Sequence, residues 1–170
     1  KLTVEPGVVL KFEDYGYINV QNGLIANGGS TTDSAIIFTS ARDDFYGGDT
    51  YNNGTADAPW NSAWRGIYFY NESIDDDCIL KNCIIKYGSY SDRGAVTLDN
   101  ASPKIQNCRF EKGYHGVMCL NTSLPTLADC DFIDTEYNNG YAVWNKNSAN
   151  TVTATNCYFN SNTGPRHSTN

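Results

Sequence analysis

The chain has 170 residues, of which 40% are hydrophobic and 18% are charged, and its formal net charge is −7 at pH 7. That charge repels nucleic acid and anionic membrane surfaces, and it favours cations, calcium above all. No run approaches the roughly 20 apolar residues that cross a bilayer, so no insertion into a membrane is expected. The abundant Asn, Thr, Ser, Gly and Tyr disfavour helices and favour short strands joined by turns.

The N-terminal part of the chain predicts the opening strands. Residues 2–12 (LTVEPGVVLKF), 17–28 (YINVQNGLIANG) and 35–40 (AIIFTS) are short apolar or alternating runs. They are separated by Pro-Gly, Asn-Gly and Gly-Gly signals, which are typical of turns between strands.

The stretch 42–64 is longer than an ordinary bend and is acidic at both ends, so it is predicted to be an inserted loop. Its oxygen-bearing side chains are of the kind that calcium prefers, and bound calcium would order the loop rather than do chemistry. The alternative is a solvated loop rich in Asx turns. The candidate calcium ligands are Asp43, Asp44, Asp49, Asn53 and Asp57.

The rest of the chain repeats. Segments of the form [apolar or small]-x-[Asn/Asp]-Cys-x-[Ile/Phe] are centred on Cys83, Cys108, Cys130 and Cys157, at intervals of 25, 22 and 27 residues. A second strand signal that begins with glycine precedes each segment. The cysteine segment and the strand signal that begins with glycine recur together at this period, which indicates a solenoid of stacked coils.

Stacked coils align inward side chains, so these four cysteines are predicted to form one buried column. The Asn or Asp before each cysteine is predicted to lie at a bend, where it tolerates an unusual φ. Aligned side chains have poor geometry for a disulfide. Cys78 and Cys119 lie outside the column, and their pairing stays open.

The runs LTVEPGVVLKF, INVQNGLIANGGS, AIIFTSARDD, GGDT and ATNCYFNSNTGPRH resemble those of secreted right-handed β-helix proteins of the pectate-lyase-like superfamily, especially bacterial surface members. The resemblance implies an all-β, right-handed, single-stranded parallel β-helix of about six coils. It also implies that residues 1–170 form one domain of a larger secreted or cell-surface protein. It does not fix an activity, because that superfamily contains lyases, glycosidases, adhesins and inert spacers. In such relatives the GGDT element continues with Asn and Asp where this chain has Tyr51 and Asn53, which argues against strong metal binding.

The aromatic residues carry the functional hypothesis. Outward aromatic rings in successive coils, beside Asn and Asp, are suited to binding sugar rings. The alternative is that tyrosine, a good strand residue, only covers the sheet. The candidate glycan-binding residues are Trp60, Trp64, Tyr68, Tyr70 and Trp144.

No catalytic residue is predicted. His115 and His167 are isolated in the sequence, and the acidic run Asp75-Asp76-Asp77 has no base placed beside it. We therefore expect a non-catalytic module that binds cell-surface glycans or polysaccharide. One alternative is a lyase or glycoside hydrolase that acts on acidic polysaccharide. Another is a structural rod whose unpaired ends contact neighbouring domains or stack on copies of itself into a fibre.

Overall fold

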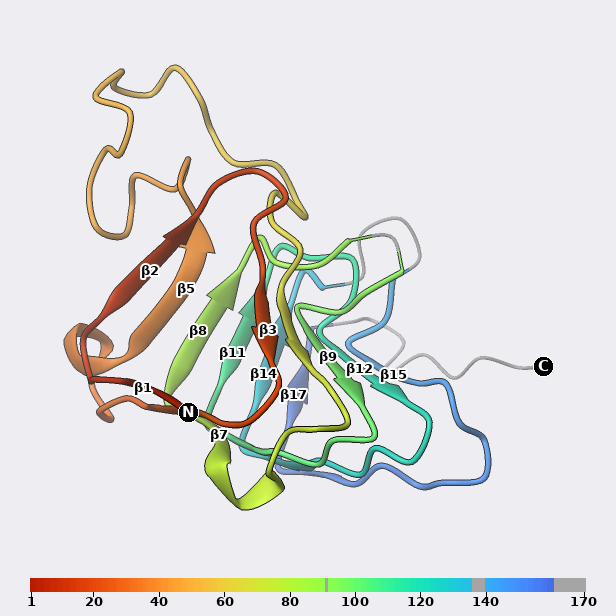
Figure 1. Cartoon of the computed structure of the whole chain (residues 1–170). Coiled ribbons are helices and arrows are strands. Elements are labelled where there is room, and N and C mark those ends of the chain that lie inside the picture. The colour runs from red at the N-terminus through yellow and green to blue at the C-terminus, as the bar shows by residue number, and fades with distance from the viewer. Residues whose placement is uncertain (91, 136–139, 161–170) are drawn as a thin grey trace.

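The computed structural model describes residues 1–90, 92–135 and 140–160. The chain winds through three parallel sheets, here named A, B and C, and visits them in that order on each turn. Figure 1 shows the successive strands of sheet B, from β2 to β17, stacked along the molecule.

Every sheet is built from strands of successive turns, so strands that are neighbours in space are distant in the sequence. Sheet A contains β1 (Leu2–Val4), β4 (Leu24–Asn27), β7 (Cys78–Lys81), β10 (Lys104–Gln106), β13 (Thr126–Ala128) and β16 (Ala154–Thr155). Sheet B contains β2 (Val9–Phe12), β5 (Ile36–Ser40), β8 (Cys83–Lys86), β11 (Arg109–Glu111), β14 (Asp131–Ile133) and β17 (Tyr158–Phe159). Sheet C contains β3 (Ile18–Val20), β6 (Ile67–Phe69), β9 (Val96–Asp99), β12 (Val117–Leu120) and β15 (Val143–Asn145).

Helical structure in the described residues is limited to two 3₁₀ turns, η1 (Thr32–Ser34) and η2 (Asp75–Asp77). Neither has the length and apolar character that crossing a membrane requires. The predicted all-β, parallel architecture is therefore confirmed.

Alternate residues of each strand point into the core and stack on their equivalents in the next turn. In sheet B, the rings of Phe110 and Phe132 are parallel, with centroids 4.9 Å apart. Phe132 stacks in the same way on Phe159 at 5.2 Å. The apolar spacing of the sequence thus becomes a set of continuous columns that bury the inner faces of the sheets.

The repeating cysteines occupy one such column. The register of sheet B aligns Ile84, Arg109, Asp131 and Tyr158, each of which directly follows one of the four cysteines. Cys83, Cys108 and Cys130 are buried and Cys157 is half-buried. All six cysteines are free thiols, including the buried Cys78 and Cys119.

The residue before each of these cysteines turns the chain from sheet A to sheet B. Asn82, Asn107, Asp129 and Asn156 all have positive φ, between 49° and 53°. Their side chains also connect the turns, because the Asn107 amide donates to Oδ1 of Asn82 at 2.6 Å. Asn and Asp accept this left-handed conformation more readily than most residues do, which explains the recurring Asn/Asp-Cys step.

Candidate functional site

An exposed aromatic cluster surrounds an arginine that sequence reasoning did not select. Arg65 lies just before β6, and its guanidinium carbon is 5.5 Å from the ring centroid of Tyr15 and 5.2 Å from that of Tyr90. The two rings pack edge to face, with centroids 6.0 Å apart. Tyr15 is 53% exposed and Tyr90 is 38% exposed, so both rings face solvent at the bends between sheets B and C.

The cluster continues onto the outer face of sheet C. The backbones of Tyr90 and Arg93 exchange hydrogen bonds across a tight turn. The Arg93 guanidinium lies 5.0 Å from the ring centroid of Tyr68, and that ring lies 4.3 Å from the ring of Tyr70. These contacts form one continuous surface, which we call the arginine–tyrosine strip. Its members are Tyr15, Arg65, Tyr90, Arg93, Tyr68 and Tyr70.

The electrostatics of the strip are unusual for so acidic a chain. Within the described residues, neither Arg65 nor Arg93 forms an ion pair, whereas Arg42 and Arg109 both bind carboxylates. The buried Nε of Arg65 has no hydrogen-bond partner in the structure. The strip therefore presents two arginines that form no ion pair with any carboxylate among the described residues.

The Tyr68 hydroxyl connects the strip to the neighbouring strand β9. It donates a hydrogen bond of 3.2 Å to Oδ2 of Asp99. Burial, followed by the negative charge of Asp99, raises the pKa of Tyr68 to about 12. The phenol therefore stays protonated at physiological pH, and its single proton is donated to Asp99.

The assignment of Trp64 to a glycan surface is wrong. Its side chain is fully buried, it stacks on Phe12 with centroids 4.2 Å apart, and its Nε1 donates to the Lys86 carbonyl at 2.8 Å. A Cβ at Gly88 would lie 2.9 Å from the indole ring, so this glycine leaves the space that the ring occupies. Trp64 is thus a core residue that closes the corner between β6 and β8.

The other predicted aromatic residues separate into three places. Tyr68 and Tyr70 belong to the strip, and Trp60 is 46% exposed in the loop 42–64, under the guanidinium of Arg42. Trp144 shares the column of Tyr68 in sheet C but lies three strands further along. At about 4.8 Å per strand, the separation is roughly 14 Å.

Trp144 has a cluster of its own around it. The Trp144 ring packs on Tyr141 and His115, with centroid distances of 5.1 Å and 4.7 Å. The amine of Lys146 lies 4.7 Å from the centroid of the Trp144 ring. His115, which looks isolated in the sequence, also accepts a hydrogen bond from the Tyr141 amide at Nδ1. His167 lies outside the described residues.

The structure does not gather the predicted calcium ligands, so that grouping is wrong. Asp43 accepts a 2.6 Å hydrogen bond from Thr39, and Asp57 pairs with Arg42 at 3.2 Å. Asp49 accepts hydrogen bonds from the backbone amides of Tyr51 and Gly54. No set of three or more His, Cys, Asp or Glu in the part of the chain that the structure describes is placed to hold a metal ion. Asp44 and Asn53 therefore do not lie beside a group of metal-ligating side chains that they could join.

Sequence reasoning selected Tyr68 and Tyr70 of the strip but not Arg65 and Arg93, whose positions before the strands were interpreted as surface charge. One signal was present: Arg65 and Arg93 each precede the glycine that opens a strand of sheet C. Which tyrosines lie beside them depends on the bends at Tyr15 and Tyr90, whose paths no periodic pattern predicts.

Three parallel sheets that share one apolar core define a parallel β-helix. Residues 19–167 match the family model described as the right-handed β-helix region, and the chain belongs to this family. The predicted right-handed β-helix is thereby confirmed. No curated protein and no solved structure matches the chain.

Proposed function

We propose that this β-helix is a non-catalytic, secreted or cell-surface module that binds glycans along the arginine–tyrosine strip. The observation that carries the proposal is a pair of arginines, without an ion pair among the described residues, that are packed against solvent-facing or half-buried tyrosine rings. Adhesion to a glycan-coated surface is the role that follows for a rigid domain with such a face.

The chemistry of the strip suits a carbohydrate chain. Tyrosine rings offer flat apolar surfaces for the faces of sugar rings. The guanidinium of Arg65 has rings of Tyr15 and Tyr90 beside it, so its terminal N–H groups are left to donate in its own plane. One N–H group in that plane can donate to a sugar hydroxyl, and two neighbouring N–H groups can donate together to a carboxylate.

The strip also has a suitable length and rigidity. It runs from a bend onto a sheet, and the strand β6 that holds Tyr68 is hydrogen-bonded on both sides, to β3 and β9. Side chains on paired strands are held in place before binding, which reduces the ordering cost of association. Trp144 lies roughly 14 Å further along the same column, separated from the strip by the buried Thr97 and Met118.

A glycan array followed by titration of its best ligand tests the proposal. We expect Arg65→Ala and Tyr90→Ala each to weaken binding by at least about tenfold, because each removes a central contact. Tyr158→Ala is the matched control, since Tyr158 is 55% exposed but lies on β17, at the far end of sheet B.

Two outcomes contradict the proposal. One is an array without any bound glycan, or binding that Arg65→Ala and Tyr90→Ala leave unchanged. The other is the release of unsaturated products or new reducing ends from a bound polysaccharide, which would make the chain an enzyme. Circular dichroism of each variant verifies that a loss of binding is not a loss of fold.

A further inference from the structure

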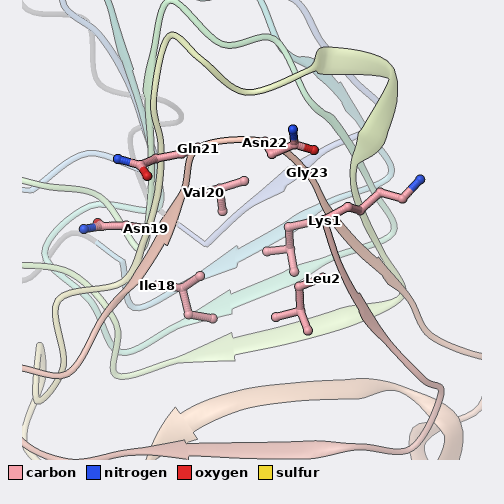
Figure 2. Close-up of a pocket in the computed structure, with 9 residues that line it drawn as sticks. Lys1, Leu2, Ile18, Asn19, Val20, Gln21, Asn22 and Gly23 are labelled. Carbon is pink, nitrogen blue, oxygen red and sulfur yellow. The ribbon is translucent and has the colours of Figure 1, made fainter.

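The titratable side chains that the arginine–tyrosine strip leaves unused gather on the outer face of sheet B. The open pocket of about 320 Å³ at the first turn differs from this place, because Figure 2 shows mainly apolar and amide side chains along its wall, among them Leu2 and Ile18. Sheet B instead brings a lysine and two carboxylates together from three successive turns. Lys86 ends β8, Glu111 ends β11 in register with it, and Asp43 follows β5.

Lys86 is the most enclosed cation of these ion pairs. Its side chain is 15% exposed, and its amine lies 3.9 Å from Oδ2 of Asp43 and 3.8 Å from Oε2 of Glu111. Both distances are too long for a hydrogen bond, and none to this amine is found among the described residues. Elsewhere in the described part of the chain, the lysines that pair with carboxylates are at least 42% exposed, namely Lys1, Lys104 and Lys112.

Aromatic rings surround the Lys86 amine. The ring centroids of Phe45, Tyr46 and Tyr87 lie 5.5 Å, 5.4 Å and 5.1 Å from its Nζ. Burial raises the pKa of Tyr46, and it raises the pKa of Tyr87 to about 12, which indicates poorly hydrated surroundings. Ring faces attract a cation but offer it no strong hydrogen-bond acceptor, so the ammonium ion is poorly solvated here.

The carboxyl group of Asp43 is buried and fixed beside this amine. Its Oδ2 accepts a 2.6 Å hydrogen bond from the Thr39 hydroxyl, and its Oδ1 accepts one of 3.3 Å from the Phe45 amide. Hydrogen bonds to both oxygens stabilise the negative charge that they gain when a nucleophile attacks the carboxyl carbon. Glu111 differs, because its Oε1 is bound to Arg109.

We propose that Lys86 and Asp43 condense to an intramolecular amide bond, which ties the start of the loop 42–64 to sheet B. The ammonium group first transfers a proton to the carboxylate of Glu111. Nζ then attacks Cγ of Asp43, so that the N–C bond forms and one C–O bond breaks. The oxygen leaves as water with one proton from Nζ and the proton that Glu111 held, and Glu111 ends as a carboxylate. No oxidant or other reactant is consumed.

The reaction leaves the remaining charges of the site paired. Glu111 and Arg109 stay behind, and they already contact each other. The amide replaces a poorly hydrated ion pair by a neutral group, which removes a desolvation cost. Because the amine and the carboxyl group are held side by side, the condensation is intramolecular and its orientation is set beforehand. The bond encloses residues 43–86, so it limits how far this part of the chain can open.

The intact mass of the purified chain, measured after reduction and unfolding, tests the proposal. We expect a mass that is lower than the mass of the sequence by one water. Trypsin should leave Lys86 uncleaved, and tandem mass spectrometry should find it joined to the peptide that begins with Asp43. A chain with the full mass of its sequence overturns the proposal. A bond from Lys86 to Glu111 instead of Asp43 also overturns it.

Three variants test the roles of the groups. Lys86→Arg keeps the positive charge but does not become a neutral nucleophile, so it is expected to show the full mass of its sequence. Glu111→Gln lacks the proton acceptor, and we expect the linked fraction of freshly made protein to fall at least about tenfold. Lys112→Arg is the matched control, because Lys112 pairs with the exposed Asp134, and it should lose one water as the parent chain does.

The variants also give outcomes that contradict the proposal. Loss of one water in Lys86→Arg overturns the assignment of Lys86 as the nucleophile. An unchanged linked fraction in Glu111→Gln overturns the proton transfer. Circular dichroism of each variant verifies that a missing bond is not the result of a missing fold.

Discussion

Asparagine and aspartate at left-handed positions make the bend between sheets A and B in every turn from β7 onward. In the preceding turn the chain leaves β4 at Gly28, which does not have a positive φ, and the Asn82 amide donates to the Gly28 carbonyl at 2.6 Å. The bend thus combines a conformational requirement with a side-chain hydrogen bond to the turn below. This combination explains why the residue before each cysteine is restricted to Asn or Asp.

Substitutions of Asn107 separate these two contributions. Asn107→Ala is expected to destabilise the fold by about 2 kcal/mol, because alanine disfavours φ near 50° and cannot donate to Asn82. Asn107→Gly loses only the hydrogen bond and is expected to lose about 1 kcal/mol. Urea unfolding measures both free energies. Equal losses in the two variants would show that the backbone conformation contributes nothing.

At the residue scale, the sequence repeat predicts the direction of some side chains but not of others. The column of Cys83, Cys108 and Cys130 follows from the repeat, because alternation within a strand fixes which side chains face inward. Trp64 lies in the bend before β6, outside the repeating strand segments, so no repeat indicated its direction. Its burial depends on the space beside Gly88, which only the folded chain reveals.

At the scale of elements, the loop 42–64 is held by one arginine. Figure 1 shows this orange-to-yellow segment extending beyond β2 and β5. Arg42 binds Asp14 at 2.9 Å and Asp57 at 3.2 Å, and its guanidinium lies 4.9 Å from the ring of Trp60. A single side chain thus connects both ends of the loop to the bend that follows β2.

Arg42→Ala is expected to release the loop without unfolding the solenoid. Chymotrypsin would then cleave the loop, which carries Phe45 and Tyr51 in exposed positions, several-fold faster than in the parent chain. Arg109→Ala is the control, because Arg109 also pairs with a carboxylate but lies on β11. Digestion followed by mass spectrometry locates the cuts. Cleavage at parental rates in Arg42→Ala would show that the loop is held by its other contacts.

The loop also shows why its chemistry was mispredicted. Its boundaries were visible because no strand signal interrupts residues 42–64. The partners of its carboxylates were not visible, because Thr39, the partner of Asp43, lies outside the loop and irregular backbone sets each side chain individually. Composition alone therefore suggested a calcium site where Asp43, Asp49 and Asp57 instead bind protein donors.

At the scale of the whole molecule, the core buries thiols and phenols together. Burial raises the pKa of Cys119 to about 12 and that of Cys108 well above its ordinary value of 9.0. Tyr87 behaves likewise, because burial raises its pKa from 10.0 to about 12. The solenoid therefore keeps these groups neutral, whereas an unfolded chain would ionise them at their ordinary values.

This difference predicts loss of stability in alkali. Below pH 9 the thiols are protonated in both states, so their contribution to stability is fully present. As the pH rises from 9 towards 12, the unfolded chain releases thiol protons that the folded chain retains. Each such thiol then lowers the unfolding free energy by up to about 1.4 kcal/mol per pH unit.

Melting temperatures measured under reducing conditions should therefore be constant from pH 7 to 8.5 and fall above pH 9. Cys119→Val, which removes one buried thiol, should fall less steeply between pH 9 and 10, before tyrosine ionisation contributes. A melting temperature that stays flat to pH 10, or a Cys119→Val curve parallel to that of the parent chain, would contradict the burial of these thiols in a common core.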